Sequence, residues 1–289
     1  MVPAMRRSIG LVAGIAAAAL WLAPVAAAEP VTGEFGGGAV AAQPSAPLSS
    51  GSMVIGLASA DGATVQVVAT VVGRCASGTF SASVPVAADG TFSATGAVRQ
   101  AQTSTRYELR GTLTDTPSGS VTARFERTTA RSPRRCGALD VQWQARRRLG
   151  GGFGIAAAVA PAGLLLGTSD QFEAGVPRGI ALRMSPDGRF VSRAIYGVKL
   201  SCTNAGTSPT FDLPRDNLPI GPDGRVSDRE EGTVKTPSSI VKHVERFAGT
   251  LGSAGGEGMF SLELSVRRRD TGKRVTRCRS GEVRWTASY

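Results

Sequence analysis

The chain has 289 residues, of which 42% are hydrophobic and 19% charged, and its formal net charge is +11 at pH 7. This length excludes a single small domain and leaves room for one large domain or two of ordinary size. The charge bears on solubility and association and excludes no fold. Nearly all of it is arginine, so a GC-rich coding bias explains it at least as well as a polyanionic partner does. The chain's lysines are Lys199, Lys235, Lys242 and Lys273.

The N-terminal residues predict a secretory signal over residues 1–28. Arg6 and Arg7 form a basic tip, an apolar run extends from Ile9 to about Leu22, and three alanines end at Ala28. The run is too short to span about 30 Å of hydrocarbon, so no transmembrane anchor is expected after signal removal. The mature protein is expected to be secreted or extracytoplasmic, with a net charge of +9 because residues 1–28 carry two arginines and no acid.

Residues 29–50 are rich in Ala, Gly, Pro and Ser and show no apolar period. This composition predicts a disordered leader before the first folded unit. The glycine strings at 36–38 and 150–152 lack the strand–turn–helix setting of a phosphate loop, and both are interpreted as linkers.

From about residue 52 the same landmarks occur twice in the same order. In both copies a tryptophan follows a cysteine by seven residues. This order indicates an internal duplication, with repeat 1 at 51–147, a linker at 148–165 and repeat 2 at 166–289. The landmarks are Asp61-Gly62, Cys75, Asp89-Gly90, Gly111-Thr112-Leu113, Cys136 and Trp143 in the first copy, and Asp187-Gly188, Cys202, Asp223-Gly224, Gly249-Thr250-Leu251, Cys278 and Trp285 in the second.

The local pattern is that of β-structure. The segments 121–125 and 260–264 alternate apolar and polar residues, which is typical of a strand with one buried face. The segment 65–72 is nearly all apolar, as in a central strand, and the Asp-Gly steps favour hairpin turns. The sequence therefore predicts an all-β protein of two tandem antiparallel β-sandwich domains, of immunoglobulin-like or jelly-roll-like topology, each with its tryptophan in the core.

Four cysteines in an exported chain are most simply two disulfides, for which three pairings exist. Equivalent cysteines of a duplicated chain should have equivalent partners, which favours Cys75–Cys136 and Cys202–Cys278. Each bridge is expected to contribute about 4 kcal/mol. No metal or other cofactor is expected, because no cysteine pair has ligand spacing and the single histidine, His243, is far from every cysteine in sequence.

Candidate anion-binding residues precede the second cysteine of each copy. Arginine side chains there could bind phosphate or carboxylate groups through forked hydrogen bonds. The alternative is a solvated hairpin whose like charges discourage edge-to-edge strand pairing. Nucleic acid is not expected as a partner, because aromatic residues are scarce nearby. The expected partner is a cell-envelope polymer or an extracytoplasmic protein. The residues are Arg131, Arg134 and Arg135 in the first copy, and Arg267, Arg268, Arg269, Lys273 and Arg274 in the second.

No residue is marked as catalytic. His243 has no counterpart in the first copy and is expected at the surface, and no Gly-x-Ser-x-Gly elbow occurs. The acids Asp223, Asp228, Glu230 and Glu231 are expected to form a turn of solvated charge. A non-catalytic binding protein is the working hypothesis; a secreted hydrolase using loop carboxylates and a secreted inhibitor or structural module are the alternatives.

The segment Cys278-Arg279-Ser280-Gly281, followed by Trp285-Thr286-Ala287 and preceded by Phe247-Ala248-Gly249, resembles a tandem β-domain of exported proteins from high-GC bacteria. The resemblance covers both halves and is weaker in the first, where Gly137-Ala138 follows the cysteine. It implies the fold and export, and it transfers no functional residue.

Overall fold

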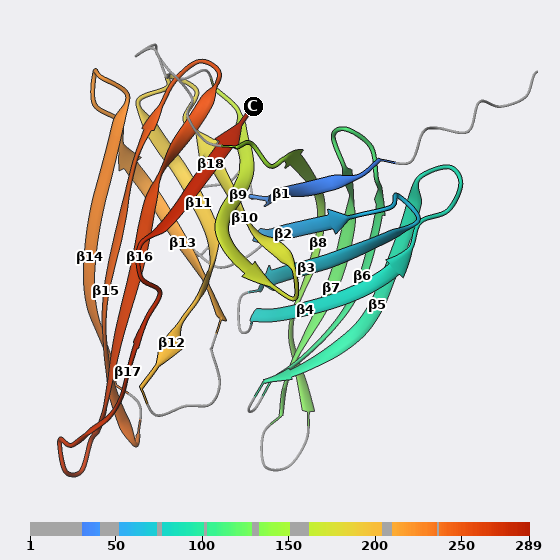
Figure 1. The fold of residues 1–289 in the computed structure, drawn as a ribbon. Helices are drawn as coiled ribbons and strands as arrows, with labels where there is room; N and C mark the ends of the chain where they lie inside the picture. The colour runs from blue at the N-terminus through green and yellow to red at the C-terminus, as the bar shows by residue number, and fades with distance from the viewer. Residues whose placement is uncertain are drawn as a thin grey trace, which may run out of the picture.

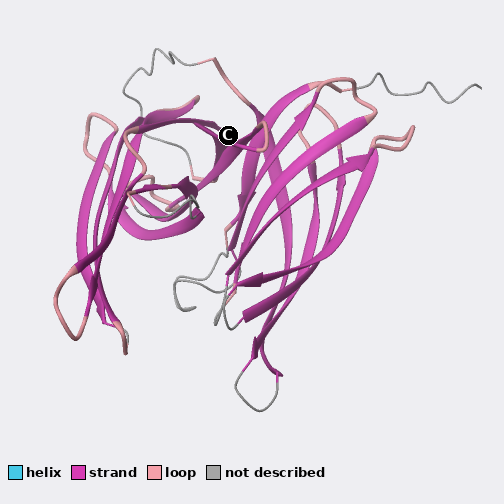
Figure 2. Cartoon of the chain, turned by 60° about the horizontal axis from the view of Figure 1, so that its bottom comes forward, coloured by secondary structure: helices cyan, strands magenta, loops and turns pink. Residues whose placement is uncertain are grey.

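The computed structural model describes residues 31–40, 52–73, 77–100, 103–128, 133–150, 162–203, 210–235 and 237–289. Within these ranges every regular element is a β-strand (Figure 2), and no helix there could span a membrane. The predicted all-β fold is confirmed. The strands form two antiparallel sheets that stand side by side (Figure 1). Each sheet curls on itself into a barrel-like shape, whereas the expected sandwich would pair two sheets within one unit. The predicted signal at 1–28 lies outside the described residues.

The first sheet has the strand order β4-β3-β2-β1-β8-β7-β6-β5. Strand β1 pairs with β8, with Phe35 opposite Arg147 and Gly38 opposite Gln144. Because the first and last strands pair, the sheet bends round and brings β4 and β5 near each other as its two edges. Their meeting line, here called a seam, has no ladder among the described residues. The strands are β1 Gly33–Ala39, β2 Ser52–Ser59, β3 Thr64–Val72, β4 Ser77–Pro85, β5 Thr91–Gln100, β6 Thr103–Thr112, β7 Ser118–Thr128 and β8 Pro133–Arg147.

The second sheet begins with β9 at Leu164, two residues before the predicted start of repeat 2. It has ten strands, and its seam lies between β13 and β14. The strands are β9 Leu164–Glu173, β10 Val176–Met184, β11 Phe190–Lys199, β12 Ser201–Cys202, β13 Thr210–Pro219, β14 Arg225–Lys235, β15 Ser239–Leu251, β16 Gly255–Arg268, β17 Arg274–Arg279 and β18 Val283–Ser288.

Both sheets have the same order of neighbours. Strands β9, β10, β11 and β13 match β1 to β4, and β14, β15 and β16 match β5 to β7. Strands β17 and β18 together occupy the place of β8, since they pair with successive parts of β16. Among the described residues, the Asp-Gly landmarks therefore fall in matching turns, and the glycine and tryptophan landmarks fall on matching strands.

The four Asp-Gly steps form the turns that the sequence predicts. Each glycine has a positive φ, between 69° and 81°, which glycine adopts without strain. Each aspartate carboxylate accepts a hydrogen bond from a main-chain amide two residues later. These local interactions fix the turns independently of the remainder of the fold.

The two sheets pack against each other through β1–β3 and β9–β11. Small apolar side chains, including Val54, Ala181 and Ile195, form a cluster between them that is separate from the two interior cores. The strands concerned are thus buried on both faces, one against their own core and one against the other sheet. This explains the continuous apolar run at 65–72, because strands covered on both faces do not alternate.

The disordered leader predicted over 29–50 is wrong for residues 33–39, which form β1, and the glycines at 36–38 are part of this strand instead of a linker. A Cβ on Gly36 would overlap the main chain of Gly167 in the neighbouring sheet. At Gly36 the main chains of the two sheets approach too closely for a side chain, and a Cβ on Gly37 or Gly38 would overlap the main chain of the paired strands β8 and β2. Because this segment contains few apolar side chains, its composition does not show that it forms a buried strand.

Trp143 and Trp285 lie in matching surroundings. Each is 1% exposed, which confirms both as core residues. Gly111 on β6 lies opposite Gly119 on β7, and a Cβ on Gly111 would lie 2.6 Å from Cζ2 of Trp143. The pair Gly249–Gly258 on β15 and β16 is placed in the same way, with 2.5 Å between a Cβ on Gly249 and Cζ2 of Trp285. In each unit a tryptophan thus fills the space left by a cross-strand glycine pair.

The predicted Cys202–Cys278 disulfide is present and joins β12 to β17, with 4.0 Å between the Cα atoms. It lies within the second unit, as expected from the repeated order of the sequence landmarks. The predicted Cys75–Cys136 bridge falls outside the described residues.

Candidate functional site

The far ends of β14 to β17 carry the densest positive charge of the described chain. These residues, 232–235, 237–243 and 264–278, are here called the basic extension; its β16–β17 hairpin reaches away from the body of the second unit (Figure 1). Strand pairing places Lys235 opposite Ile240, Ile240 opposite Arg267 and Arg267 opposite Arg274. Directly paired residues share a face of the sheet. Three cations therefore lie in one row across four strands.

A second row lies two residues closer to the core on the same face. It runs from Thr233 through Lys242 and Ser265 to Arg277. Arg277 donates a hydrogen bond to Glu263 at 2.8 Å, and this bond, with two further arginines nearby, holds the pKa of Glu263 below its usual value. Arg277 is thus charge-balanced.

The outer row is not balanced. No carboxylate lies within 4 Å of the charged groups of Lys235, Lys242, Arg267 or Arg274 among the described residues. Arg268 on the opposite face pairs with Asp270 at 3.3 Å. All of these cations except Arg277 are exposed.

The structure brings five of the eight predicted anion-binding residues together. Arg267, Arg268, Arg269, Lys273 and Arg274 occupy the β16–β17 hairpin. Of the predicted residues in the first copy, Arg131 is outside the described residues. Arg134 and Arg135 lie in β8 opposite Arg127 and Glu126, and their side chains are outside the described part of the chain.

Sequence reasoning missed Lys235 and Lys242, which come from the neighbouring hairpin. A signal for them existed, because three of the chain's four lysines lie on the basic extension and only Lys199 lies elsewhere. In a chain whose cations are otherwise arginines, lysines gathered at one place cannot be attributed to coding bias.

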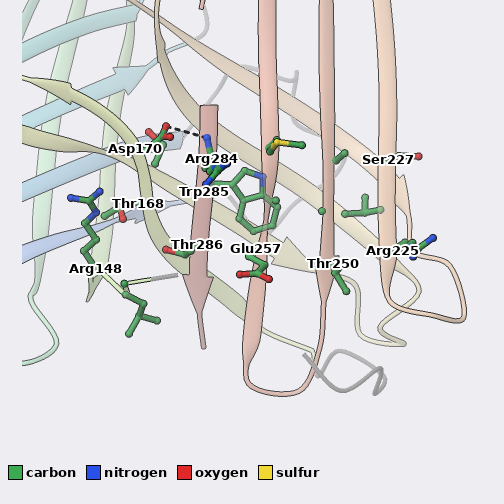
Figure 3. A pocket seen from close by; sticks show the side chains of 18 of the residues that line it. Arg148, Thr168, Asp170, Arg225, Ser227, Thr250, Glu257, Arg284, Trp285 and Thr286 are labelled. Carbon is green, nitrogen blue, oxygen red and sulfur yellow. Dashed lines mark hydrogen bonds between the residues drawn. The ribbon is translucent and has the colours of Figure 1, made fainter. Parts of the chain in front are cut away.

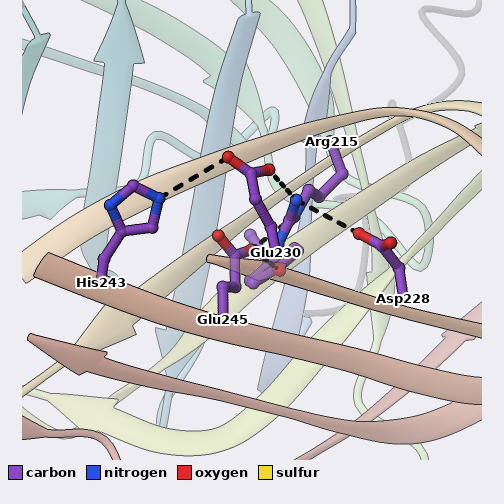
Figure 4. A network of polar contacts seen from close by, with 6 residues as sticks. Arg215, Asp228, Glu230, His243 and Glu245 are labelled. Atoms are coloured by element: carbon purple, nitrogen blue, oxygen red, sulfur yellow. Dashed lines mark hydrogen bonds and ion pairs between the residues drawn. The ribbon is translucent and has the colours of Figure 1, made fainter. Parts of the chain in front are cut away.

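A buried ionic network closes the seam of the second unit (Figure 4). Arg215 on β13 is 5% exposed and donates to Glu245 on β15 at 2.9 Å. It also pairs with Asp228 at 3.2 Å and with Glu230, both on β14. Tyr196 donates a hydrogen bond to Glu245 from the floor of the core. One arginine thus links the two edge strands where no ladder joins them.

Burial sets the protonation of this network. It raises the pKa of Glu245 above its ordinary value, against the opposing effects of Tyr196 and Arg215. Burial, and then the adjacent Glu245 carboxylate, raise the pKa of Tyr196 well above 10. The tyrosine therefore stays neutral, and its hydroxyl group donates a hydrogen bond to the carboxylate.

The corresponding place in the first unit is apolar. Tyr107, which occupies the position of Glu245, stacks on Phe80 of β4 with 3.5 Å between the ring centroids. An aromatic stack therefore fills the first seam where an arginine and three carboxylates fill the second. The difference indicates that the seam between the edge strands can be filled either by an ionic network or by an aromatic stack.

The remaining candidates differ from expectation. His243 was expected at the surface, but only 22% of its side chain is exposed, and it lies against Gly232 with Nε2 3.6 Å from Glu230. The acidic cluster was expected to be a solvated turn, yet Asp228 and Glu230 lie in β14 and bind Arg215. Within the described ranges, no group of three or more His, Cys, Asp or Glu residues is arranged to hold a metal ion.

No family model, curated protein or solved structure matches this chain.

Proposed function

We propose that the protein is an exported, non-catalytic binding protein whose basic extension binds an anionic polymer of the cell envelope through its phosphate or carboxylate groups. The observation that carries the proposal is the outer row, Lys235, Arg267 and Arg274, which share one face with no carboxylate beside them. Like charges on directly paired strands destabilise a sheet. A row of them is therefore better explained by an external anion than by the stability of the fold.

The position of Arg267 argues against protection of a sheet edge. Charged residues guard edges that would otherwise pair with another chain. Strand β16, however, is paired on both sides at this residue, with Ile240 of β15 and Arg274 of β17. The charge of Arg267 thus protects no free edge, and recognition of an anion is the better reading.

The spacing suits a chain of repeated anionic groups. Neighbouring strands lie about 4.8 Å apart, so the row from Lys235 to Arg274 extends over roughly 14 Å. The arginines offer planar forks that match a phosphate or carboxylate, while the lysines act as mobile point charges. A flexible polymer can satisfy several of these groups at once.

We also propose that the protein is exported and that its two units arose by duplication. A disulfide is compatible with an extracytoplasmic location, and the bridge Cys202–Cys278 is formed. The common strand order of the two units supports duplication. The hydrolase alternative is less favoured, because Asp228, Glu230 and Glu245 are all bound to Arg215.

The test compares two triple variants with the same change in net charge. K235Q/R267Q/R274Q removes the outer row, and R106Q/R110Q/R124Q removes three exposed cations of the first unit. Binding of fluorescent polyphosphate and polygalacturonate is measured by anisotropy from 50 to 200 mM salt. Each lost contact should reduce the slope of log K against log salt by about 0.7–0.9, so the first variant should lose about two units of slope while the control keeps the parental slope. Equal losses in both variants would show that net charge alone attracts the polymer and would overturn the proposal.

A further inference from the structure

A groove of about 1120 Å³ lies on the outer face of the second unit, away from the outer cationic row (Figure 3). Its floor is formed by five neighbouring strands, β14, β15, β16, β18 and β9, and its wall by Glu34 and the end of β8 in the first unit. The groove thus exists because the two units pack together. Arg148 on the wall is held by Glu34 at 2.6 Å and lies over the Phe172 ring at 4.8 Å.

Two rows of side chains on the outer face form the floor. Strand pairing aligns Thr250 with Glu257, Glu257 with Thr286 and Thr286 with Thr168 in one row. The next row runs from Ser227 through Ala248 and Met259 to Arg284. Hydroxyl groups therefore alternate with a carboxylate, a guanidinium and the exposed side chain of Met259, which is 44% exposed.

The groove is close to neutral. Four arginines and three carboxylates line it, and three of the arginines are matched by acids: Arg148 by Glu34 at 2.6 Å, Arg147 by Asp115 at 3.4 Å and Arg225 by Asp223 at 3.4 Å. This balance contrasts with the outer row of the basic extension. A polyanion gains little here, so the ligand must be recognised by hydrogen bonds rather than by net charge.

The first unit carries a similar hollow at the matching place. A depression of about 810 Å³ covers the outer face of β5 to β8, where Ser93, Arg110, Ser120 and Gln142 form one row. Both hollows lie over a glycine pair backed by a tryptophan. The hollow is thus repeated with the fold, although its side chains differ apart from the matching Ser93 and Ser227, and the wall contributed by the first unit deepens only the second copy.

We propose that the groove binds a neutral oligosaccharide. Such a ligand presents hydroxyl groups that both donate and accept hydrogen bonds, and the floor offers both kinds of partner: carboxylate acceptors at Glu257 and Asp170, donors at Arg284, and threonine hydroxyls that do either. Met259 provides an apolar surface for the C–H face of a sugar ring. The volume exceeds the roughly 300–1,000 Å³ typical of small-ligand pockets, so several sugar rings fit along the floor.

An extended peptide fits the groove less well. Peptides commonly dock by adding a strand to a free sheet edge. Strands β15, β16, β18 and β9 are all paired on both sides, so their main chains have no free edge here.

Isothermal titration calorimetry of the mature protein with cellohexaose, chitohexaose and mannohexaose tests the proposal, and an alternating Thr-Val decapeptide serves as the peptide probe. At least one hexasaccharide should bind with an affinity that changes less than twofold between 50 and 200 mM salt. Thr250→Phe, which fills the floor, and Arg284→Met, which removes a guanidinium that has no hydrogen-bond partner among the described residues, should each weaken binding at least tenfold. Thr233→Phe, at the other end of the same face, should leave it unchanged.

The variant K235Q/R267Q/R274Q should bind the sugar as the parent does, so failure of the polyanion proposal and failure of this one are distinguishable. Circular dichroism melts establish that Thr250→Phe and Arg284→Met are folded; should Thr250→Phe not fold, Arg284→Met decides. No binding of any hexasaccharide at millimolar concentration, binding unaffected by Arg284→Met, or binding of the decapeptide alone would overturn the oligosaccharide assignment.

Discussion

The cross-strand glycine pair beneath each tryptophan makes a quantitative prediction about Gly249→Ala. The new Cβ would lie 2.5 Å from Cζ2 of Trp285 and 2.7 Å from the carbonyl oxygen of Glu257, whereas carbon contacts are optimal at about 3.5–4.0 Å. The second contact is with main chain, so β15 and β16 must move apart. Overpacking of this kind costs about 1–3 kcal/mol, and the gain of about 0.5–1 kcal/mol from replacing glycine in a strand offsets only part of it.

The same change in the first unit should cost less. A Cβ on Gly111 would meet Phe92 and Trp143, both at 2.6 Å, and both are side chains that can shift within their rotamers. We therefore expect Gly249→Ala to lower the melting temperature more than Gly111→Ala does. The midpoints of these ranges leave a net cost of about 1.25 kcal/mol, and at about 2–4 °C per kcal/mol the loss for Gly249→Ala is about 3–5 °C. Gly150→Ala is the control, because nothing lies within 4 Å of its Cβ.

Differential scanning calorimetry measures these shifts, and a double-mutant cycle with Trp285→Phe identifies the cause. A smaller ring should relieve the overlap, so Gly249→Ala should cost less in the Trp285→Phe background, with a coupling energy of at least 0.5 kcal/mol. A Gly249→Ala variant as stable as the parent, or strictly additive effects in the cycle, would refute the proposed contact between indole and glycine pair.

Three further outcomes follow from the second unit and the tyrosines. Replacing Cys202 and Cys278 by serine should lower the free energy of unfolding by about 4–5 kcal/mol, since the bridge closes a loop of 76 residues; a loss below 1 kcal/mol in urea titrations would contradict this. Arg215→Met should lower the free energy of unfolding by about 3–5 kcal/mol, because it leaves Glu245 buried without its cation. The double variant Arg215→Met/Glu245→Leu should recover at least half of this loss; a smaller recovery would show that the network does more than fill the seam. All three tyrosines have a raised pKa, that of Tyr289 to about 12, so absorbance at 295 nm should show little tyrosinate in the native protein at pH 10. The unfolded chain loses those protons near pH 10, so stability should fall as the pH rises above 10; half-ionisation of the native tyrosines at pH 10 would contradict the burial.

Local chemistry made part of this fold readable from the sequence. The Asp-Gly steps specify turns through glycine conformation and a carboxylate two residues away, and those contacts need no distant partner. The repeated spacing of cysteine and tryptophan was informative because it allows the two halves of the chain to be compared with each other. It led to the Cys202–Cys278 bridge and to the like surroundings of Trp143 and Trp285.

Features that depend on distant pairing could not be read in this way. Strand β1 is buried because it pairs with β8 and packs against the second sheet, and nothing in its glycine-rich composition indicates either contact. The same pairing turns each sheet into a curled layer where alternation alone suggested a sandwich. The alternation of apolar and polar residues is common to both architectures, because it reports one buried face and not how the sheet closes.

The candidate site was predictable only where it depends on residues that are adjacent in the sequence. The sequence shows the run Arg267–Arg269 directly, but the row formed with Lys235 depends on the register of three ladders. Register over such distances is a property of the folded sheet. The groove on the outer face was not foreseen, since its wall and its floor come from different units.

Lysine footprinting tests the proposed polyanion site most directly, because the chain has only four lysines. The mature protein is acetylated with and without saturating polyphosphate, and the rate at each lysine is followed by mass spectrometry. We expect polyphosphate to slow acetylation at Lys235, Lys242 and Lys273 at least fivefold and to leave Lys199, on β11 in the body of the second unit, unchanged. Uniform protection of all four lysines, or protection of Lys199 alone, would contradict the assignment of the basic extension as the binding surface.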